Sequence, residues 1–265
     1  MISLSKYTGT LAAAVDGCHR EPMDVAQWTQ TPDGWSEAPA DVLAGAKRSA
    51  LDALSTDSDR PAHERLADFY DRSGDYAGAS FTELGPFERD DITAVDLHAT
   101  TLLSVNIGPG ATRRLLHPSV ARHKTVDALR AIPDSDLLVA GPRVLQAMES
   151  LYLNIMVAFS GPTTENPDDW EAASKLCARK RPNLFPVRNE VVRGYLGLRS
   201  EAGRDDYRVD WQVFRALISD RDLMEAIDRL TPLISEVAMW RKVQTETTRL
   251  RILDTALSTW VRSGP

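Results

Sequence analysis

Apolar residues recur at helical spacing along most of the chain. Between Asp41 and Leu54 they follow the i, i+3, i+4 spacing of a helix with one buried face. The same spacing predicts further helices at 62–72, 93–105, 111–116, 122–132, 142–159, 169–180, 190–198, 210–218, 220–236 and 246–262. Strand-like alternation never exceeds four residues in the C-terminal two thirds of the sequence. The sequence therefore predicts a mainly α fold.

Turn-forming and capping residues set the expected helix ends. Thr93, with Asp96 three residues later, predicts a variant of the capping box at a helix start. Gly108-Pro109-Gly110 predicts a break between two helices. The stretch Gly74–Gly85 is punctuated by glycine and is predicted to be a loop.

The density of turn residues also suggests a division of the chain. Residues 1–40 contain several prolines and glycines, so we expect 1–60 to form an irregular, partly helical N-terminal segment. The remainder, 61–265, is expected to form a helical domain, or two lobes of which one spans about 90–200.

The composition of the chain says more about the cellular compartment of the protein than about its activity. The chain has 265 residues and a net charge of −7, so any nucleic-acid surface must be a local patch. Cys18 and Cys177 are far apart and have no nearby histidine partner, which predicts neither a disulfide nor a zinc site. No signal peptide or membrane-spanning run is recognisable, so we expect a cytoplasmic protein without membrane contact. No motif calls for a metal or a cofactor.

One segment is basic, although the chain as a whole is acidic. Between Lys175 and Arg193 there are six basic residues and a single acid, Glu190. Cations gathered on one side of a helix and its extension could neutralise DNA phosphates, whereas the ordinary alternative is a solvated charged face. The predicted DNA-binding residues are Lys175, Arg179, Lys180, Arg181, Arg188 and Arg193.

The same segment carries a family resemblance. Ser174–Val192 reads S-K-L-C-A-R-K-R-P-N-L-F-P-V-R-N-E-V-V. It resembles a motif in distant members of the helix-hairpin-helix DNA glycosylase superfamily, and is most similar to an uncharacterised, largely actinobacterial family at its edge. The resemblance implies an all-α, glycosylase-like bundle. It also implies a protein that binds duplex DNA, flips a base out and cuts the N-glycosidic bond.

The resemblance further suggests a substrate and a catalytic position. Some relatives of this type serve anti-phage defence by removing modified bases such as glucosylated hydroxymethylcytosine. The expected partner is therefore double-stranded DNA that contains a modified base. The catalytic aspartate of the glycosylases matches Asn189 in this chain.

Three departures from the family pattern matter. The hairpin, normally L-x-G-x-G, corresponds to Ser160–Trp170, where only Gly161 is retained. The lysine of the lyase-type members falls near Glu171, with Lys175 one turn later, so a Schiff-base mechanism is not supported. Asn189 cannot stabilise an oxocarbenium ion as a carboxylate does. Either another carboxylate acts, or the chain binds without cutting.

Two other places could supply the carboxylate. The segment Phe69–Phe81 holds Asp71 and Arg72 among aromatic residues that could stack on a flipped base, and these predicted base-pocket residues are Tyr70, Tyr76 and Phe81. The alternative is that Tyr70 and Phe81 belong to the core and that Asp71 and Arg72 form a surface pair. Asp96 lies near a helix start, where capping is the ordinary role of an acid, although a buried member could be a general base.

Three functions follow as hypotheses. The first is a monofunctional DNA glycosylase that excises a modified base. The second is a non-catalytic nucleic-acid-binding protein of the same fold, which Asn189 favours. The third is a helical protein that interacts with another protein, which the net acidic charge favours.

Overall fold

The computed structural model describes residues 31–161, 169–198, 207–239, 241–243 and 248–263. Within these ranges no β-strand forms, and the predicted mainly α class is confirmed. No helix among them is long and apolar enough to cross a membrane. The helices are α1 (Ala40–Ala53), α2 (Ala62–Phe69), α3 (Gly78–Glu83), α4 (Ala94–Thr101), α5 (Pro109–Leu116), α6 (Val120–Ala131), η2 (Leu137–Val139), α7 (Pro142–Ser160), α8 (Trp170–Lys180), α9 (Glu190–Tyr195), α10 (Tyr207–Ser219), α11 (Arg221–Ala238) and α12 (Arg249–Ser263).

Local chemistry at the helix starts agrees with the sequence prediction. The Asp96 N–H donates to Thr93 Oγ1 at 3.2 Å, and the Thr93 N–H donates back to Asp96 Oδ2 at 3.0 Å. This reciprocal pair is the expected capping box at the start of α4. Pro109 occupies the first turn of α5 after the break at Gly108, where its missing N–H carries no cost.

The predicted loop at 74–85 is wrong in part, because it contains the short helix α3. Glycine punctuation hid this helix, whose C-terminal end is stabilised from elsewhere in the chain. The guanidinium of Arg179 donates to the carbonyls of Phe81, Thr82 and Leu84. Carbonyls at a helix end lack intrahelical donors, so a buried arginine supplies what the local sequence does not.

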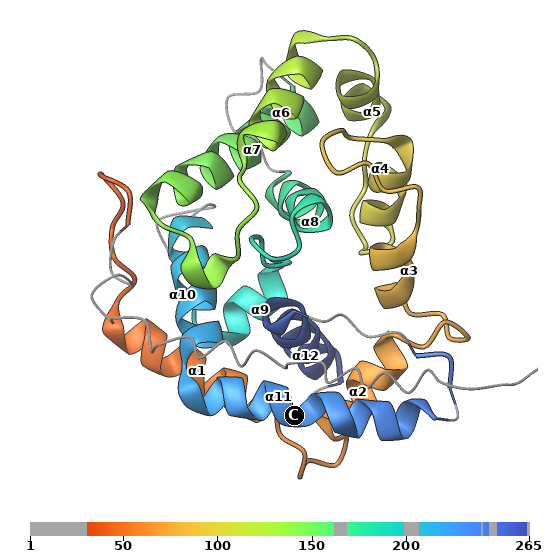
Figure 1. Cartoon of the computed structure of the whole chain (residues 1–265), viewed down its shortest axis with the longest axis vertical. Coiled ribbons are helices and arrows are strands. Elements are labelled where there is room, and N and C mark those ends of the chain that lie inside the picture. Colours follow the sequence, from red (N-terminus) through yellow and green to blue (C-terminus); the bar gives the residue numbers. More distant parts are fainter. Residues whose placement is uncertain (1–30, 162–168, 199–206, 240, 244–247, 264–265) are drawn as a thin grey trace, which may run out of the picture.

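Helix α8 lies at the centre of the arrangement, enclosed by other helices (Figure 1). Every residue of α8 is buried except Glu171, and α4 and α7 pack against it. Cys177 is a free and fully buried cysteine on this helix, and burial raises the pKa of its thiol. The apolar core therefore surrounds α8 on almost all sides.

Part of the expected N-terminal segment packs with the main body. Helix α1 contacts α10, α11 and α12, and Trp35 packs against Trp211 with ring centroids 6.0 Å apart. Residues 1–30, which carry much of the predicted irregular structure, lie outside the described residues.

The six predicted DNA-binding cations do not form an exposed face, and this prediction needs correction. None is more than 6% exposed: Lys175, Arg179, Lys180, Arg181, Arg188 and Arg193. Lys180 Nζ lies 2.9 Å from Asp96 Oδ2, and Arg179 Nε lies 3.4 Å from Asp96 Oδ1. Asp96 is itself fully buried, so α4 and α8 are joined by an internal ion pair.

The other cations of the segment are used in the same way. Arg188 Nε and Arg193 Nε both contact Asp210 Oδ2, at 2.5 and 2.9 Å, which fixes the α8–α9 connection against α10. Arg181 donates to the Leu129 carbonyl at the end of α6 and pairs with Asp90. A buried cation without an acceptor is costly, so each of these partners is required by the burial.

We expect Asp96→Asn to lower the free energy of unfolding by about 3–5 kcal/mol, because it leaves the buried Lys180 and Arg179 without their carboxylate. Asparagine keeps an oxygen for the capping box, so the change removes mainly charge. Urea unfolding followed by circular dichroism measures the effect.

Asp134→Asn is the matched control. The Asp134 side chain is 88% exposed and pairs with Arg89 on the surface, so its loss should change stability by less than about 1 kcal/mol. Equal stability of the two variants would contradict the structural role of Asp96.

Candidate functional site

A cavity of about 300 Å³ opens between the ends of several helices. Its walls come from α2, α3, α8, α9, α12 and the turn that follows α4. Four of the residues singled out in the sequence line it: Tyr70, Phe81, Lys175 and Asn189. Residues more than 100 positions apart in the chain thus share one enclosure.

Aromatic side chains form one wall of the cavity. Phe69 and Tyr70 meet edge to face, with ring centroids 5.1 Å apart, and Phe81 faces the cavity from α3. The Tyr70 hydroxyl lies 2.7 Å from Thr255 Oγ1, which ties this wall to α12. A Cβ on Gly78 would lie 2.3 Å from the Phe69 ring, so only glycine allows α3 to approach this closely.

Helix α8 contributes a lysine and a carboxylate to the lining. Lys175 Nζ donates to Glu171 Oε2 at 2.9 Å and to the Leu103 carbonyl at 3.1 Å. The next residue, Ser104, lines the cavity with φ of +63°, a left-handed conformation that is unfavourable for a side chain other than glycine or asparagine. Backbone strain of this kind tends to persist where the surrounding structure holds it, as Lys175 does here.

Asn189 serves as the N-cap of α9. Its Oδ1 accepts the N–H of Val192 at 2.9 Å, while the neighbouring N–H of Glu190 donates to Glu171 Oε1 at 3.0 Å. The asparagine therefore lines the cavity and holds the helix start at the same time. The carboxylate of Glu171 lies beside it, although the two residues are 18 positions apart.

A second carboxylate and two arginines complete the lining from α12. Asp254 Oδ2 accepts a hydrogen bond from the backbone N–H of Val187 at 2.9 Å and one from the guanidinium of Arg251 at 3.1 Å. Arg251 also donates to the Ala178 carbonyl and lies over the Phe81 ring at 5.9 Å. Arg262 lines the cavity from the last turn of α12.

Four of the predicted catalytic and base-pocket residues do not line this cavity. Asp71 accepts hydrogen bonds from the N–H and hydroxyl of Ser73, which lower the pKa of its carboxyl group, and Arg72 pairs with Glu83. Tyr76 is half exposed and borders a smaller cavity of about 60 Å³ instead. Asp96 is occupied by its internal ion pairs.

Sequence reasoning missed Glu171, Arg251 and Asp254 as lining residues. Arg251 and Asp254 stand in no recognisable motif of the C-terminal helix, so the sequence alone gives no sign that they face a cavity. Among the described residues, no group of three histidine, cysteine, aspartate or glutamate side chains is placed to hold a metal ion. The predicted hairpin region falls mostly on residues 162–168, outside the described residues.

The chain belongs to the family of unknown function DUF6308, which matches residues 62–261. Comparison with curated proteins and with solved structures finds no match. The matched range begins at the first residue of α2 and includes every residue that lines the cavity except Arg262.

We expect Gly78→Ala to lower the free energy of unfolding by about 1–3 kcal/mol, because the added methyl group would overlap the Phe69 ring and backbone. Gly74→Ala is the matched control, since its added Cβ would have only ordinary contacts, the nearest at 3.5 Å. Chemical denaturation of both variants tests the expectation. Similar losses at the two positions would argue against a tightly fitted aromatic wall.

Proposed function

We propose that this protein is a DNA glycosylase that excises a modified base, with the cavity as its base pocket. One observation carries the proposal. Tyr70 and Phe81 from one segment of the sequence and Asn189 from another all line one cavity. Base-pocket aromatics and the position matched to a catalytic aspartate are thus brought within one enclosure. A modified cytosine of phage DNA, and with it a role in defence, remains the substrate that the resemblance suggests.

The cavity has the properties that a flipped base requires. Its volume of about 300 Å³ is at the lower end of the range for small-molecule sites. Tyr70 and Phe81 border the cavity as buried residues, 2% and 6% exposed, and hydroxyl, amide and charged groups of the lining can read the edge of a base.

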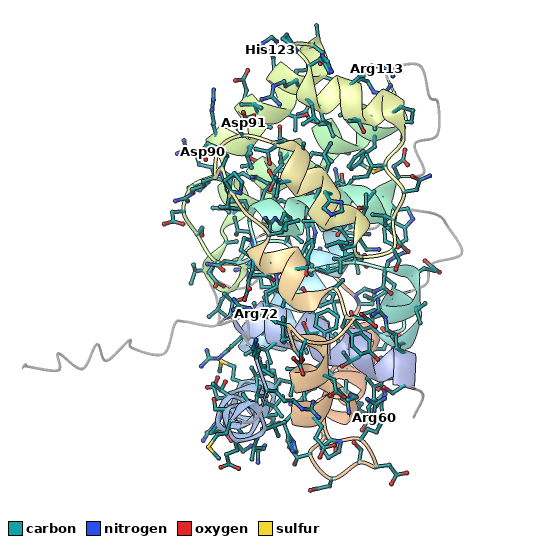
Figure 2. The ribbon with its side chains drawn as sticks, turned by 90° about the vertical axis from the view of Figure 1, so that its right-hand side faces the viewer. Arg60, Arg72, Asp90, Asp91, Arg113 and His123 are labelled. Carbon is teal, nitrogen blue, oxygen red and sulfur yellow. The ribbon has the colours of Figure 1, made fainter. Side chains whose placement is uncertain are left out.

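The duplex would need a phosphate-binding surface other than the buried cations. Exposed cations are available on α5 and α6, where Arg113, Lys124 and Arg130 are exposed. Figure 2 shows Arg113 and His123 at the upper end of the molecule, while Asp90, Asp91 and Arg72 lie further down the same view. We therefore propose α5 and α6 as the surface that contacts the DNA backbone.

A second candidate is a non-catalytic DNA-binding protein of the same fold. The observation that favours it is the use of Asn189 as an N-cap, since an amide there supplies no negative charge to a sugar cation. This candidate shares the duplex surface with the glycosylase and differs only in chemistry. A helical protein that interacts with another protein would neither bind the duplex nor excise a base.

We expect the pure protein to create alkali-labile abasic sites in phage-modified DNA and not in unmodified DNA. Val191→Trp should reduce the rate at least about tenfold, because Val191 lines the cavity, is 58% exposed and can be enlarged without disturbing the core. Counting strand breaks after alkaline treatment measures the reaction.

Val139→Trp is the matched control, because Val139 is 45% exposed on η2 and lies neither in the cavity lining nor on the proposed DNA surface. It should retain wild-type activity. An absence of breaks in every DNA tested, together with salt-sensitive binding, would favour the non-catalytic candidate. Equal activity of both tryptophan variants would remove the cavity from the reaction.

We expect Lys124→Glu combined with Arg130→Glu to weaken duplex binding at low salt about tenfold or more and to flatten its salt dependence. Both side chains are exposed on α6, so the fold should be unaffected. Fluorescence anisotropy with a labelled duplex provides the measurement. Arg221→Glu with Arg229→Glu on α11 makes the same charge change at exposed positions and should have a smaller effect. Equal effects would indicate that only net charge matters.

A further inference from the structure

Glu171 is the carboxylate of the cavity that is best placed to act on a substrate. Two carboxylates, Glu171 and Asp254, line the cavity. Asp254 is only 4% exposed and is held by the Val187 N–H and Arg251. The Glu171 side chain is 32% exposed, on the one residue of α8 that is not buried. Of the two, Glu171 is the one that a bound ligand could reach.

The position of the Glu171 carboxylate is fixed by two donors on opposite oxygens. Lys175 Nζ contacts Oε2 at 2.9 Å, and the Glu190 N–H donates to Oε1 at 3.0 Å. Lys175 is itself held by the Leu103 carbonyl, beside the left-handed Ser104. A carboxylate restrained in this way is preorganised, so it needs little rearrangement to stabilise a developing positive charge.

We infer that Glu171 is the catalytic carboxylate of this protein, in place of an acid at position 189. The inference rests on the proposed function. The Glu190 N–H that holds Glu171 belongs to the residue next to Asn189, so the negative charge lies beside that position in space while coming from α8. Asn189 then acts as a positioning residue, because it caps the helix whose first N–H holds Glu171.

The chemistry follows from this placement. The bond between C1′ and the base nitrogen breaks, and its electron pair leaves with the base. The resulting sugar cation is stabilised by the negative charge of Glu171. Water adds its oxygen to C1′, and the proton that water loses passes through the Glu171 carboxylate to the departing base. The products are a free base and an abasic site, and no other reactant is consumed.

A binding experiment tests Glu171 without requiring turnover. Two duplexes are compared by anisotropy: one holds a cationic pyrrolidine analogue of the abasic sugar, and the other holds the neutral tetrahydrofuran analogue. We expect the wild type to bind the cationic duplex at least about tenfold more tightly, because only the cationic sugar analogue attracts the carboxylate. Glu171→Gln should reduce that preference to about twofold or less.

Two further variants complete the test. Glu190→Gln removes the neighbouring carboxylate, which is 51% exposed, and should retain the preference for the cationic duplex. Glu171→Asp keeps the charge on a shorter side chain and should retain part of the preference. Together they separate charge at position 171 from general charge and from damage to the fold.

The outcomes are distinguishable. If the wild type shows no preference, or if Glu171→Gln keeps it, the assignment of Glu171 is overturned while the glycosylase proposal stands. If the wild type binds neither duplex at low salt, the proposed function is overturned and this inference with it. A preference that is lost in Glu171→Gln and kept in Glu190→Gln supports both.

Discussion

The constraint on which this structure depends is the burial of cations around α8. Arg179 and Lys180 meet Asp96 of α4, and Arg188 and Arg193 meet Asp210 of α10. Buried ion pairs add little net stability over apolar residues of equal volume, but losing one partner is expensive. Their effect is therefore on arrangement. Each ion pair can form at only one relative position of the two elements that carry it. Together the pairs therefore fix α4 and α10 relative to the central helix α8 and the segment that follows it.

The same constraint builds the cavity. Arg179 supplies donors to the carbonyls at the end of α3, and α3 carries Phe81 into the aromatic wall. Arg251 binds the Ala178 carbonyl and Asp254, and Asp254 holds the backbone just before Asn189. Groups that satisfy buried charge thus also position the lining residues. The basic segment that the sequence identified is central to the candidate site. Its cations hold in place the elements that form the walls of the cavity, and they do not serve to bind a ligand's phosphates.

The fold could be predicted from the sequence because helical spacing is a local property. The predicted helices match the observed ones to within a few residues, and the capping box at Thr93 is present. The short helix α3 was missed, since its C-terminal end depends on Arg179, almost 100 positions later. Burial of the cations was missed for a related reason. Their acids lie on α4 and α10, and a single sequence gives no sign that these helices pack against the basic segment.

The candidate site could be predicted only in part, because some of its residues stand out locally in the sequence and others do not. Aromatic residues and Asn189 stand out in a motif or a turn, and so could be identified before their positions were known. Glu171 does not stand out, because an acid in the first turn of a helix is ordinary there. Its significance comes from three contacts that only the fold creates: the cavity, Lys175 and the Glu190 N–H. In our proposal Glu171 supplies from α8 the negative charge that Asn189 lacks, because the fold brings the start of α8 beside the start of α9.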